Sequence, residues 1–208
     1  MKYLMGIDCE TIKNITKKPT YMLGIDTETG GLLPESSLLT AYFGFYELTN
    51  GKFNRVDELD LKIKPNDDVY HLTAESLDIN KINIVEHNKM AISEKLAGQQ
   101  LYKKLENWHR IAKEKLIPVG HNVGFDIRKV TTTLISMGSW ESFVSYRVMD
   151  TCTIAQFYRI CEKLPDNISC SLGHLAAYYK IHTNGKRHEA KCDVETTMAV
   201  LENLINNA

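Results

Sequence analysis

The chain has 208 residues, of which 43% are hydrophobic, and a formal net charge of −1. Its length suits one domain with a single well-buried core. Its apolar runs are far below the roughly 18 residues that a membrane-spanning helix needs, and its near-zero charge excludes a broadly basic nucleic-acid-binding surface.

Cysteine usage and the N-terminus indicate a cytoplasmic protein. The N-terminal residues lack the pattern of a secretory signal peptide. Cys161, Cys170 and His174 match no common zinc-site spacing. The odd number of cysteines, with no C-x-x-C pair, favours reduced thiols over a disulfide framework. The five cysteines are Cys9, Cys152, Cys161, Cys170 and Cys192.

Two stretches near the N-terminus resemble each other, YLMGIDCETI at residues 3–12 and YMLGIDTETG at residues 21–30. Each contains a D-x-E pair, and the second pair is Asp26 with Glu28. Residues two apart in a strand point to the same face, with Cβ atoms roughly 6–7 Å apart. Two such carboxylates can share one hard cation. An isolated D-x-E is nevertheless short and common, and it is more often a pair of solvated acids.

Hydrophobic patterning predicts strands first and then helices with short strands between them. Asn50-Gly51, between the second and third predicted strands, is a strong hairpin signal. This order of elements predicts an α/β layered domain with a mixed sheet. The three strands cover residues 21–28, 38–48 and 52–63, and they are mostly antiparallel. The later elements are a helix, a strand, a helix, a strand and three helices, within residues 91–115, 116–120, 122–137, 147–150, 152–161, 171–181 and 190–205.

Two later motifs change the interpretation of the D-x-E pair. GHNVGFD, at residues 120–126, places Asp126 in the first turn of a helix directly after a predicted strand. HEAKCD, at residues 188–193, places His188 before Asp193, which opens the last helix. In combination with Asp26 and Glu28, these motifs resemble the DEDD 3′→5′ exonucleases of the histidine subtype. That family includes ribonuclease T and the proofreading subunit of bacterial replicative polymerase.

The order and rough separation of the three motifs fit that family, and the resemblance covers residues 21 to about 206. The sister subtype has a tyrosine where this chain has Glu189, so the histidine subtype is favoured. YHLTAESLDINKI at residues 70–82, followed by His87, is similar to a segment common in phage-encoded members. We therefore expect a small, free-standing, phage-type exonuclease of a bacterial cell or a phage-infected host.

The resemblance implies a ribonuclease H-like fold, with a central mixed β-sheet flanked by α-helices, and two divalent metal ions, Mg²⁺ or Mn²⁺. Asp26, Glu28 and Asp193 are the implied ligands, and Asp126 acts partly through water. In-line displacement at phosphorus develops charge on the attacking and leaving oxygens, and two cations about 3.5–4 Å apart stabilise both. His188 is the implied general base, because an imidazole with a pKa near 6.5 accepts a proton at neutral pH.

Further residues are candidates for substrate contact. The turn after Glu28 is rich in glycine and lets the backbone approach a phosphate or sugar closely. Apolar side chains are candidates for stacking on terminal bases, although each is more often part of a core. Asn122 is as well suited to capping the helix that follows it. The predicted substrate-binding residues are Thr29, Gly30, Leu72, Asn122 and Phe125.

The second D-x-E copy is expected to be the catalytic one. A glycine-rich turn and the predicted hairpin follow Glu28 directly, whereas Lys17, Lys18 and Pro19 follow Glu10 without a glycine or a nearby hairpin. Residues 1–20 are therefore interpreted as an N-terminal extension and residues 21–208 as the exonuclease domain. The extension has three open interpretations: an edge strand, a disordered segment, or a duplicated start region without a role.

The predicted function is a metal-dependent exonuclease that releases nucleoside monophosphates from 3′ ends, with single-stranded DNA favoured over RNA as the substrate. A replication or repair protein is a candidate partner, and no membrane partner is expected. One alternative is a catalytically silent nucleic-acid-binding accessory protein of the same fold, and another is an exoribonuclease. A small-molecule NTP-binding protein is disfavoured, because the chain has no G-x4-G-K-[ST] loop.

Overall fold

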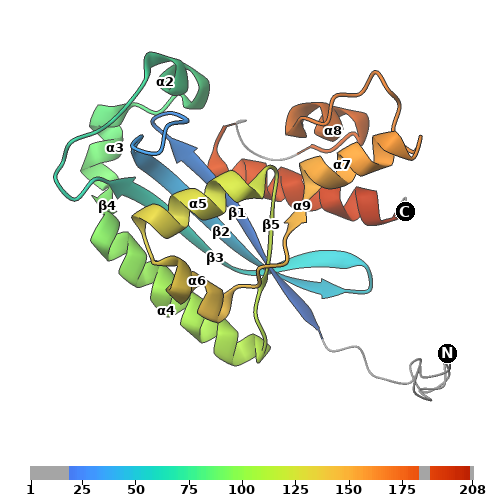
Figure 1. Cartoon of the computed structure of the whole chain (residues 1–208), viewed down its shortest axis with the longest axis horizontal. Helices are drawn as coiled ribbons and strands as arrows, with labels where there is room; N and C mark the ends of the chain where they lie inside the picture. The colour runs from blue at the N-terminus through green and yellow to red at the C-terminus, as the bar shows by residue number, and fades with distance from the viewer. Residues whose placement is uncertain (1–18, 183–187, 207–208) are drawn as a thin grey trace, which may run out of the picture.

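The computed structural model describes residues 19–182 and 188–206, so the first D-x-E copy lies outside the described residues. Its centre is a mixed sheet with the strand order β4-β3-β2-β1-β5-β6 (Figure 1). The β1–β2 and β2–β3 pairs are antiparallel, whereas β1–β5, β5–β6 and β3–β4 are parallel. The strands are β1 (Thr20–Thr29), β2 (Leu38–Thr49), β3 (Lys52–Lys64), β4 (Ile92–Ser93), β5 (Ile117–Gly120) and β6 (Met149–Asp150).

The predicted hairpin is confirmed. Thr49 pairs with Lys52, and the two residues between them, Asn50 and Gly51, have φ angles of 54° and 75°. A two-residue hairpin turn with positive φ at both positions matches the right-handed twist of its strands, and Asn-Gly adopts it at little cost. The turn therefore fixes the register of β2 against β3.

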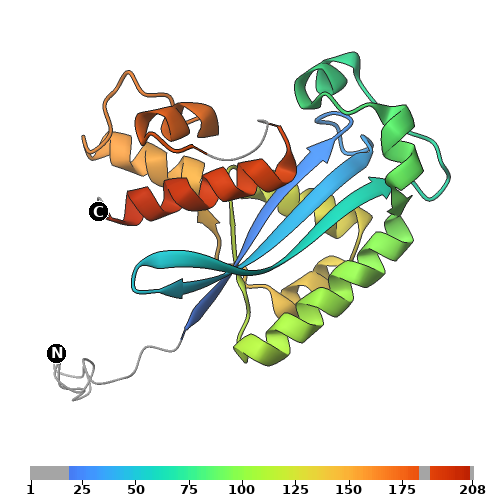
Figure 2. The same cartoon turned by 180° about the vertical axis from the view of Figure 1, so that it is seen from behind.

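The two-residue period of the strands gives the sheet two apolar faces. One face, which includes Leu23 and Phe43, packs against α4, α5 and α6. The other face, which includes Met22 and Tyr42, packs against α9 (Figure 2). A third cluster joins α7 and α8 to the outer side of α9. These helices are α4 (Glu94–Ala112), α5 (Val123–Thr133), α6 (Met137–Phe143), α7 (Thr151–Ile160), α8 (Leu172–Tyr178) and α9 (Ala190–Asn206).

One predicted helix is wrong in its extent. The apolar stripe expected to run to Met137 belongs to two helices, because α5 ends at Thr133 and α6 begins after Ser136. The Ser136 hydroxyl accepts a hydrogen bond from the Ser139 N–H and starts the new helix. The hydroxyl of Thr132 donates to the Arg128 carbonyl, an interaction that weakens the end of a helix.

Two short helices were not predicted at all. They are α2 (Ala74–Asn80) and α3 (Ile84–Met90). Each is too short for a helical period to be visible in its sequence, but each begins at a side-chain cap, Thr73 for α2 and Asn83 for α3. The remaining elements confirm the α/β class and the mixed sheet. Within the described part of the chain, no helix combines the length and apolarity needed to cross a membrane.

Candidate active site

The first two acidic residues of the site come from the end of β1. The alternation of side chains along the strand puts Asp26 and Glu28 on the same face of the sheet, the face that α9 covers. Both are partly exposed. Thr27 lies between them and points to the opposite face. There its hydroxyl donates a hydrogen bond of 2.6 Å to Oδ1 of Asp126, in the first turn of α5.

The third and fourth acids come from helices on opposite faces of the sheet. Asp126 belongs to α5 and is only 5% exposed. Asp193 belongs to the first turn of α9. The strand end is the place where the two helices approach each other across the sheet. The structure therefore brings the four acids predicted from three separate motifs into one region.

The pKa values show how closely these carboxylates approach one another. Burial raises the pKa of Asp26 well above its usual value, and the charges of Asp126, Glu28 and Asp193 raise it further. Burial, followed by the charges of Asp193 and Asp126, raises the pKa of Glu28 to about 8. The protein without bound cations therefore holds protons on carboxyl groups that would be ionised in water at neutral pH.

The pKa of Asp126 is set by a different combination of effects. Burial raises its pKa to about 7, although the hydrogen bond from Thr27 lowers it. The charge of Asp150 raises it as well. The Thr27 hydroxyl and backbone hydrogen bonds thus hold this buried carboxyl in a fixed orientation.

The donor set fits a divalent metal ion. Ligand atoms of Glu28, His188 and Asp193 all lie within 4.8 Å of one another. Carboxylate oxygens suit hard cations such as Mg²⁺ and Mn²⁺. Cations placed between the acids would relieve the repulsion that raises their pKa values. Asp26 and Asp126 supply further carboxylates next to this group, as their mutual electrostatic effects show.

His188 lies at the edge of this site, just before α9. It is exposed, and its φ of 64° is uncommon for a residue other than glycine. Its backbone N–H donates a hydrogen bond of 3.2 Å to Oδ2 of Asp193. The backbone of the His188 segment is therefore tied to the same carboxylate that faces the other acids, which keeps the imidazole near them.

The predicted capping role of Asn122 is wrong. Asn122 has φ 61°, is exposed and makes no side-chain hydrogen bond to the start of α5. Asp150 takes that role: its Oδ2 accepts from the Val123 N–H at 2.9 Å, and its Oδ1 accepts from the Thr153 N–H at 3.0 Å. One carboxylate thus caps α5 and α7 together. The contact of Asn122 with substrate stays a prediction.

The glycine after the D-x-E pair makes a close contact within the protein. A Cβ at Gly30 would collide with the backbone carbonyl of His71 and would lie 2.7 Å from Cδ2 of Leu72. Gly30 donates to the Ser37 carbonyl at 2.8 Å and accepts from the Thr73 N–H at 2.7 Å. This close packing within the protein explains why position 30 requires a glycine. A phosphate contact through Gly30, and a base contact through the half-buried Leu72, stay predictions.

An apolar cavity of about 400 Å³ opens beside Glu28. Thr29 and Phe125 line it, as expected of substrate-contacting residues. The Thr29 hydroxyl donates to the Gly31 carbonyl at 2.7 Å, which leaves its methyl group for packing. Sequence analysis missed three exposed apolar side chains of this cavity, because no motif marks them. They are Leu32, Leu33 and Ile79, which are 86%, 59% and 50% exposed.

A second cavity, of about 350 Å³, lies on the other side of Glu28. His188 lines it, together with three lysines, Lys62, Lys81 and Lys191, and three further acids, Asp60, Glu86 and Glu189. Glu28 and Thr40, and then Thr40 and Lys62, are direct cross-strand partners in the sheet register. Glu28 thus lines both an apolar cavity and a cavity with charged groups of both signs.

An α/β domain with four carboxylates and a histidine at the end of its central strand is the arrangement of a metal-dependent nuclease. Comparison with known families agrees: a family model described as Exonuclease matches residues 23–201. The chain belongs to this exonuclease family. No curated protein sequence matches the chain.

Solved structures establish the fold. Exonuclease I of E. coli, in complex with a dT13 oligonucleotide, matches with a TM-score of 0.70 and 20% identity over 90% of this chain and 41% of that chain. A moderately thermophilic exonuclease I from Methylocaldum szegediense matches with a TM-score of 0.69 and 18% identity over 90% and 40%. Cell-death related nuclease 4 matches with a TM-score of 0.65 and 17% identity over 91% and 64%. The chain thus spans less than half the length of these exonuclease I structures, and its fold is ribonuclease H-like.

Proposed function

We propose that this chain is a 3′→5′ exonuclease of the histidine subtype that removes nucleoside monophosphates from single-stranded DNA. The observation that carries this proposal is the convergence of Asp26, Glu28, Asp126 and Asp193 beside His188. The raised pKa values of Asp26, Glu28 and Asp126 support it, because bound cations would relieve the burial penalty and the mutual repulsion of these carboxylates.

Each of these residues has a separate task in the proposed reaction. Two divalent ions, Mg²⁺ or Mn²⁺, would be held by Asp26, Glu28 and Asp193, with Asp126 acting partly through water, and they stabilise charge on the attacking and leaving oxygens. Thr27 orients Asp126 by donating to its Oδ1. His188 accepts the proton of the attacking water as general base, and its position at the solvent-exposed edge of the site suits transfer of that proton to bulk water.

The apolar cavity suits the terminal nucleotide of a single strand. Phe125, Leu32 and Ile79 present apolar surface beside Glu28. Stacking and apolar contact bind every base similarly, which fits an enzyme that must process any sequence. Unpaired ends are favoured because a base can enter the cavity only when it has left its duplex. The dT13 oligonucleotide in the E. coli exonuclease I structure supports DNA as the substrate.

The alternatives are a silent binding protein of the same fold and an exoribonuclease. Retention of all four acids together with His188 argues against a silent protein, because binding alone does not need clustered carboxylates that repel a phosphate backbone. RNA is distinguished from DNA by contacts to the 2′-hydroxyl. Matched DNA and RNA oligonucleotides therefore belong in the same assay.

The test uses one oligonucleotide labelled at either end. With Mg²⁺, a 3′ label should be released at once as a mononucleotide, whereas a 5′ label should give a ladder that shortens with time. EDTA should stop both reactions. His188→Ala should lower kcat by about 10²–10⁴-fold, the usual contribution of a general base. Absence of metal-dependent release, or release of the 5′ label first, would contradict the proposal.

A further inference from the structure

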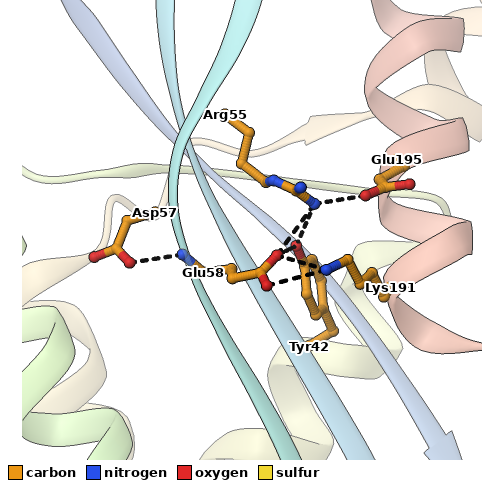
Figure 3. A network of polar contacts seen from close by, with 6 residues as sticks. All are labelled: Tyr42, Arg55, Asp57, Glu58, Lys191 and Glu195. Carbon is orange, nitrogen blue, oxygen red and sulfur yellow. Dashed lines mark hydrogen bonds and ion pairs between the residues drawn. The ribbon is translucent and has the colours of Figure 1, made fainter.

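A network of charged side chains joins the start of α9 to β2 and β3 (Figure 3). Lys191 lies 2.9 Å from Oε2 of Glu58. The Tyr42 hydroxyl donates to the same oxygen at 2.7 Å and accepts from Nη1 of Arg55 at 3.0 Å. Arg55 also contacts Glu58 at 3.1 Å and Glu195 at 2.5 Å. Two helix residues are thus held by one group of strand residues.

The place of this network in the sequence connects it to the candidate active site. Lys191 and Glu195 lie two residues before and two residues after Asp193 on α9. Tyr42 is the direct cross-strand partner of Asp26 in the β1–β2 register. The network therefore attaches the helical turn that carries Asp193 to the strand that lies beside Asp26.

The apolar core under α9 provides no directional contacts. Val194 and Met198 pack against the sheet, but apolar packing is non-directional and permits a small rotation of the helix about its axis. Hydrogen bonds and ion pairs have preferred distances and angles. Because Lys191 and Glu195 are i,i+4 neighbours on one side of α9, holding both fixes the rotation of the first turn, and with it the direction of the Asp193 carboxylate.

The network also differs from an ordinary surface ion pair. Tyr42 is fully buried, and its hydroxyl connects Arg55 to Glu58. The ammonium group of Lys191 lies 5.7 Å from the centre of the Tyr42 ring, a cation–π contact. Isolated exposed pairs contribute little, whereas networks anchored to a buried group hold a defined geometry.

We propose that Lys191, Glu58, Arg55 and Glu195 are positioning residues that hold Asp193 in register with Asp26 and Glu28 for divalent-metal binding. This inference rests on the proposed function, because it assigns the network a role at that metal site. None of the four residues is placed in contact with the reacting atoms. They act through the orientation of the first turn of α9.

The decisive variant is Lys191→Met, because positioning and simple electrostatics predict opposite results for it. Removing a positive charge near clustered carboxylates should tighten the binding of a divalent cation by electrostatics alone. If Lys191 positions Asp193, its loss should weaken that binding instead. Partners that bond directly to metal ligands typically contribute about 10–100-fold in affinity. We expect a smaller change, about fivefold, for a residue one step further away.

A matched control is an ion pair whose acidic partner lies next to Glu58 on β3. Lys104 pairs with Asp57 at 2.7 Å, and these side chains are 26% and 33% exposed, close to the 35% and 40% of Lys191 and Glu58. This pair attaches β3 to α4 on the opposite face of the sheet. Lys104→Met should lower the melting temperature about as much as Lys191→Met and leave metal binding unchanged. Lys191→Arg should keep the ion pair and restore wild-type affinity.

The measurement is calorimetric titration of the full chain with Mn²⁺, together with the Mg²⁺ concentration that gives half-maximal cleavage. A weaker Mn²⁺ affinity in Lys191→Met, with Lys104→Met unaffected, supports the inference. Equal or tighter binding in Lys191→Met overturns it and leaves the exonuclease proposal intact. If the wild-type chain neither binds Mn²⁺ nor cleaves DNA, the proposed function fails and the inference fails with it.

Discussion

At the scale of single residues, the site is built from carboxylates whose environment opposes their charge. Glu28, with a pKa of about 8, and Asp126, with a pKa of about 7, lie in surroundings where burial disfavours ionisation. Such residues weaken the folded state unless a ligand compensates them, so their presence at the end of a central strand indicates a binding function. The second D-x-E copy belongs to this strand end, whereas the first lies outside the described residues.

Asp26→Ala should abolish metal-dependent cleavage, whereas Asp8→Ala should leave it largely intact. The charges of the other three acids all raise the pKa of Asp26, and its loss removes a carboxylate that lies among them. Asp8 precedes the described residues and belongs to the first copy of the stretch. Initial rates on a labelled single strand, with folding checked by circular dichroism, measure both effects. Loss of cleavage in Asp8→Ala with retention in Asp26→Ala would reverse the assignment.

Motifs identified the acids because the chemistry constrains their residue types and spacing. The same reasoning could not find Asp150 as the cap of α5, or Leu32 beside Phe125, because these contacts join segments far apart in the sequence. It also assigned capping to Asn122, since asparagine before a helix is a common cap. The αL backbone of Asn122 and the carboxylate of Asp150 override that local preference.

At the scale of elements, the position of α5 determines where Asp126 lies. Asp150 holds the first turn of α5 and the first turn of α7 through its two oxygens. His121 adds a contact of 2.9 Å between its Nδ1 and the hydroxyl of Thr151. The junction between β5, β6 and these two helices therefore acts as one unit behind the site.

Asp150→Ala should lower both stability and activity. Two helix starts lose their cap, and each cap typically contributes about 0.5–2 kcal/mol to the free energy of unfolding. The start of α5 then moves, and Asp126 with it, so kcat should fall. Ser136→Ala is the matched control, because it removes one cap from α6, which does not carry a site residue. Urea denaturation and cleavage kinetics measure both variants. Normal kcat in Asp150→Ala would show that α5 is positioned by its core packing alone.

Lys129 connects α5 to the loop between β1 and β2. This lysine is only 6% exposed, and its ammonium group donates to the carbonyls of Pro34 and Ser36. Burial lowers its pKa. The loop it holds carries Leu32 and Leu33, which line the apolar cavity. An element that sequence analysis treats as a plain helix thus also supports the cavity wall.

Lys129→Met should raise KM for single-stranded DNA by several-fold while kcat changes little. Methionine fills a similar volume but leaves two carbonyls without a donor, at a cost of about 1–3 kcal/mol each where they are buried. The loop then loses its fixed position, and the apolar cavity loses one wall. Lys103→Met, at an exposed position of α4, provides the charge-matched control. An unchanged KM would show that the position of this loop does not affect substrate binding.

Helix and strand identities followed from periodicity wherever an element was long enough to show a period. The pattern correctly gave β1, β2 and β3, which form the antiparallel part of the sheet, and the covering helices α4 and α9. It missed β4 (Ile92–Ser93), because these two residues were assigned to the start of the predicted helix at residues 91–115. It missed α2 and α3 because seven residues span only two turns, so caps and tertiary contacts decide their ends. It joined α5 to α6 because the apolar stripe continues across the break at Ser136.

At the scale of the whole molecule, the two faces of the sheet meet at the site. Figures 1 and 2 show α9 on one face of the sheet and α5 on the other. Asp26 and Glu28 of β1 lie on the α9 side together with Asp193 of α9, whereas Asp126 belongs to α5. The core clusters are separate on the two faces. Closing the two layers around the strand end therefore brings the acids together, so the folding free energy of the entire domain opposes their repulsion. The free energy of unfolding of the whole domain should therefore change when the repulsion between the acids is removed.

Asp126→Asn should stabilise the metal-free protein increasingly as the pH rises. The pKa of Asp126 is about 7 in the folded protein, against 3.8 as its ordinary value. Between these values the folded state holds a proton that the unfolded chain has released. The contribution of Asp126 to the free energy of unfolding therefore falls as the pH rises from about 4 to about 7. Asparagine does not ionise, yet its amide oxygen can still accept the hydrogen bond from Thr27.

Urea denaturation of both proteins in EDTA, from pH 4 to pH 8, measures this effect as a difference. The comparison cancels the contributions of His87 and His121, whose pKa values are lowered by burial and whose effect on stability has the opposite sign. The stability difference should widen as the pH rises from about 4 to about 7. Saturating Mg²⁺ should narrow it, because ions that bind only the folded wild-type protein restore its stability. A difference that does not change with pH would show that the fold does not hold this carboxyl protonated.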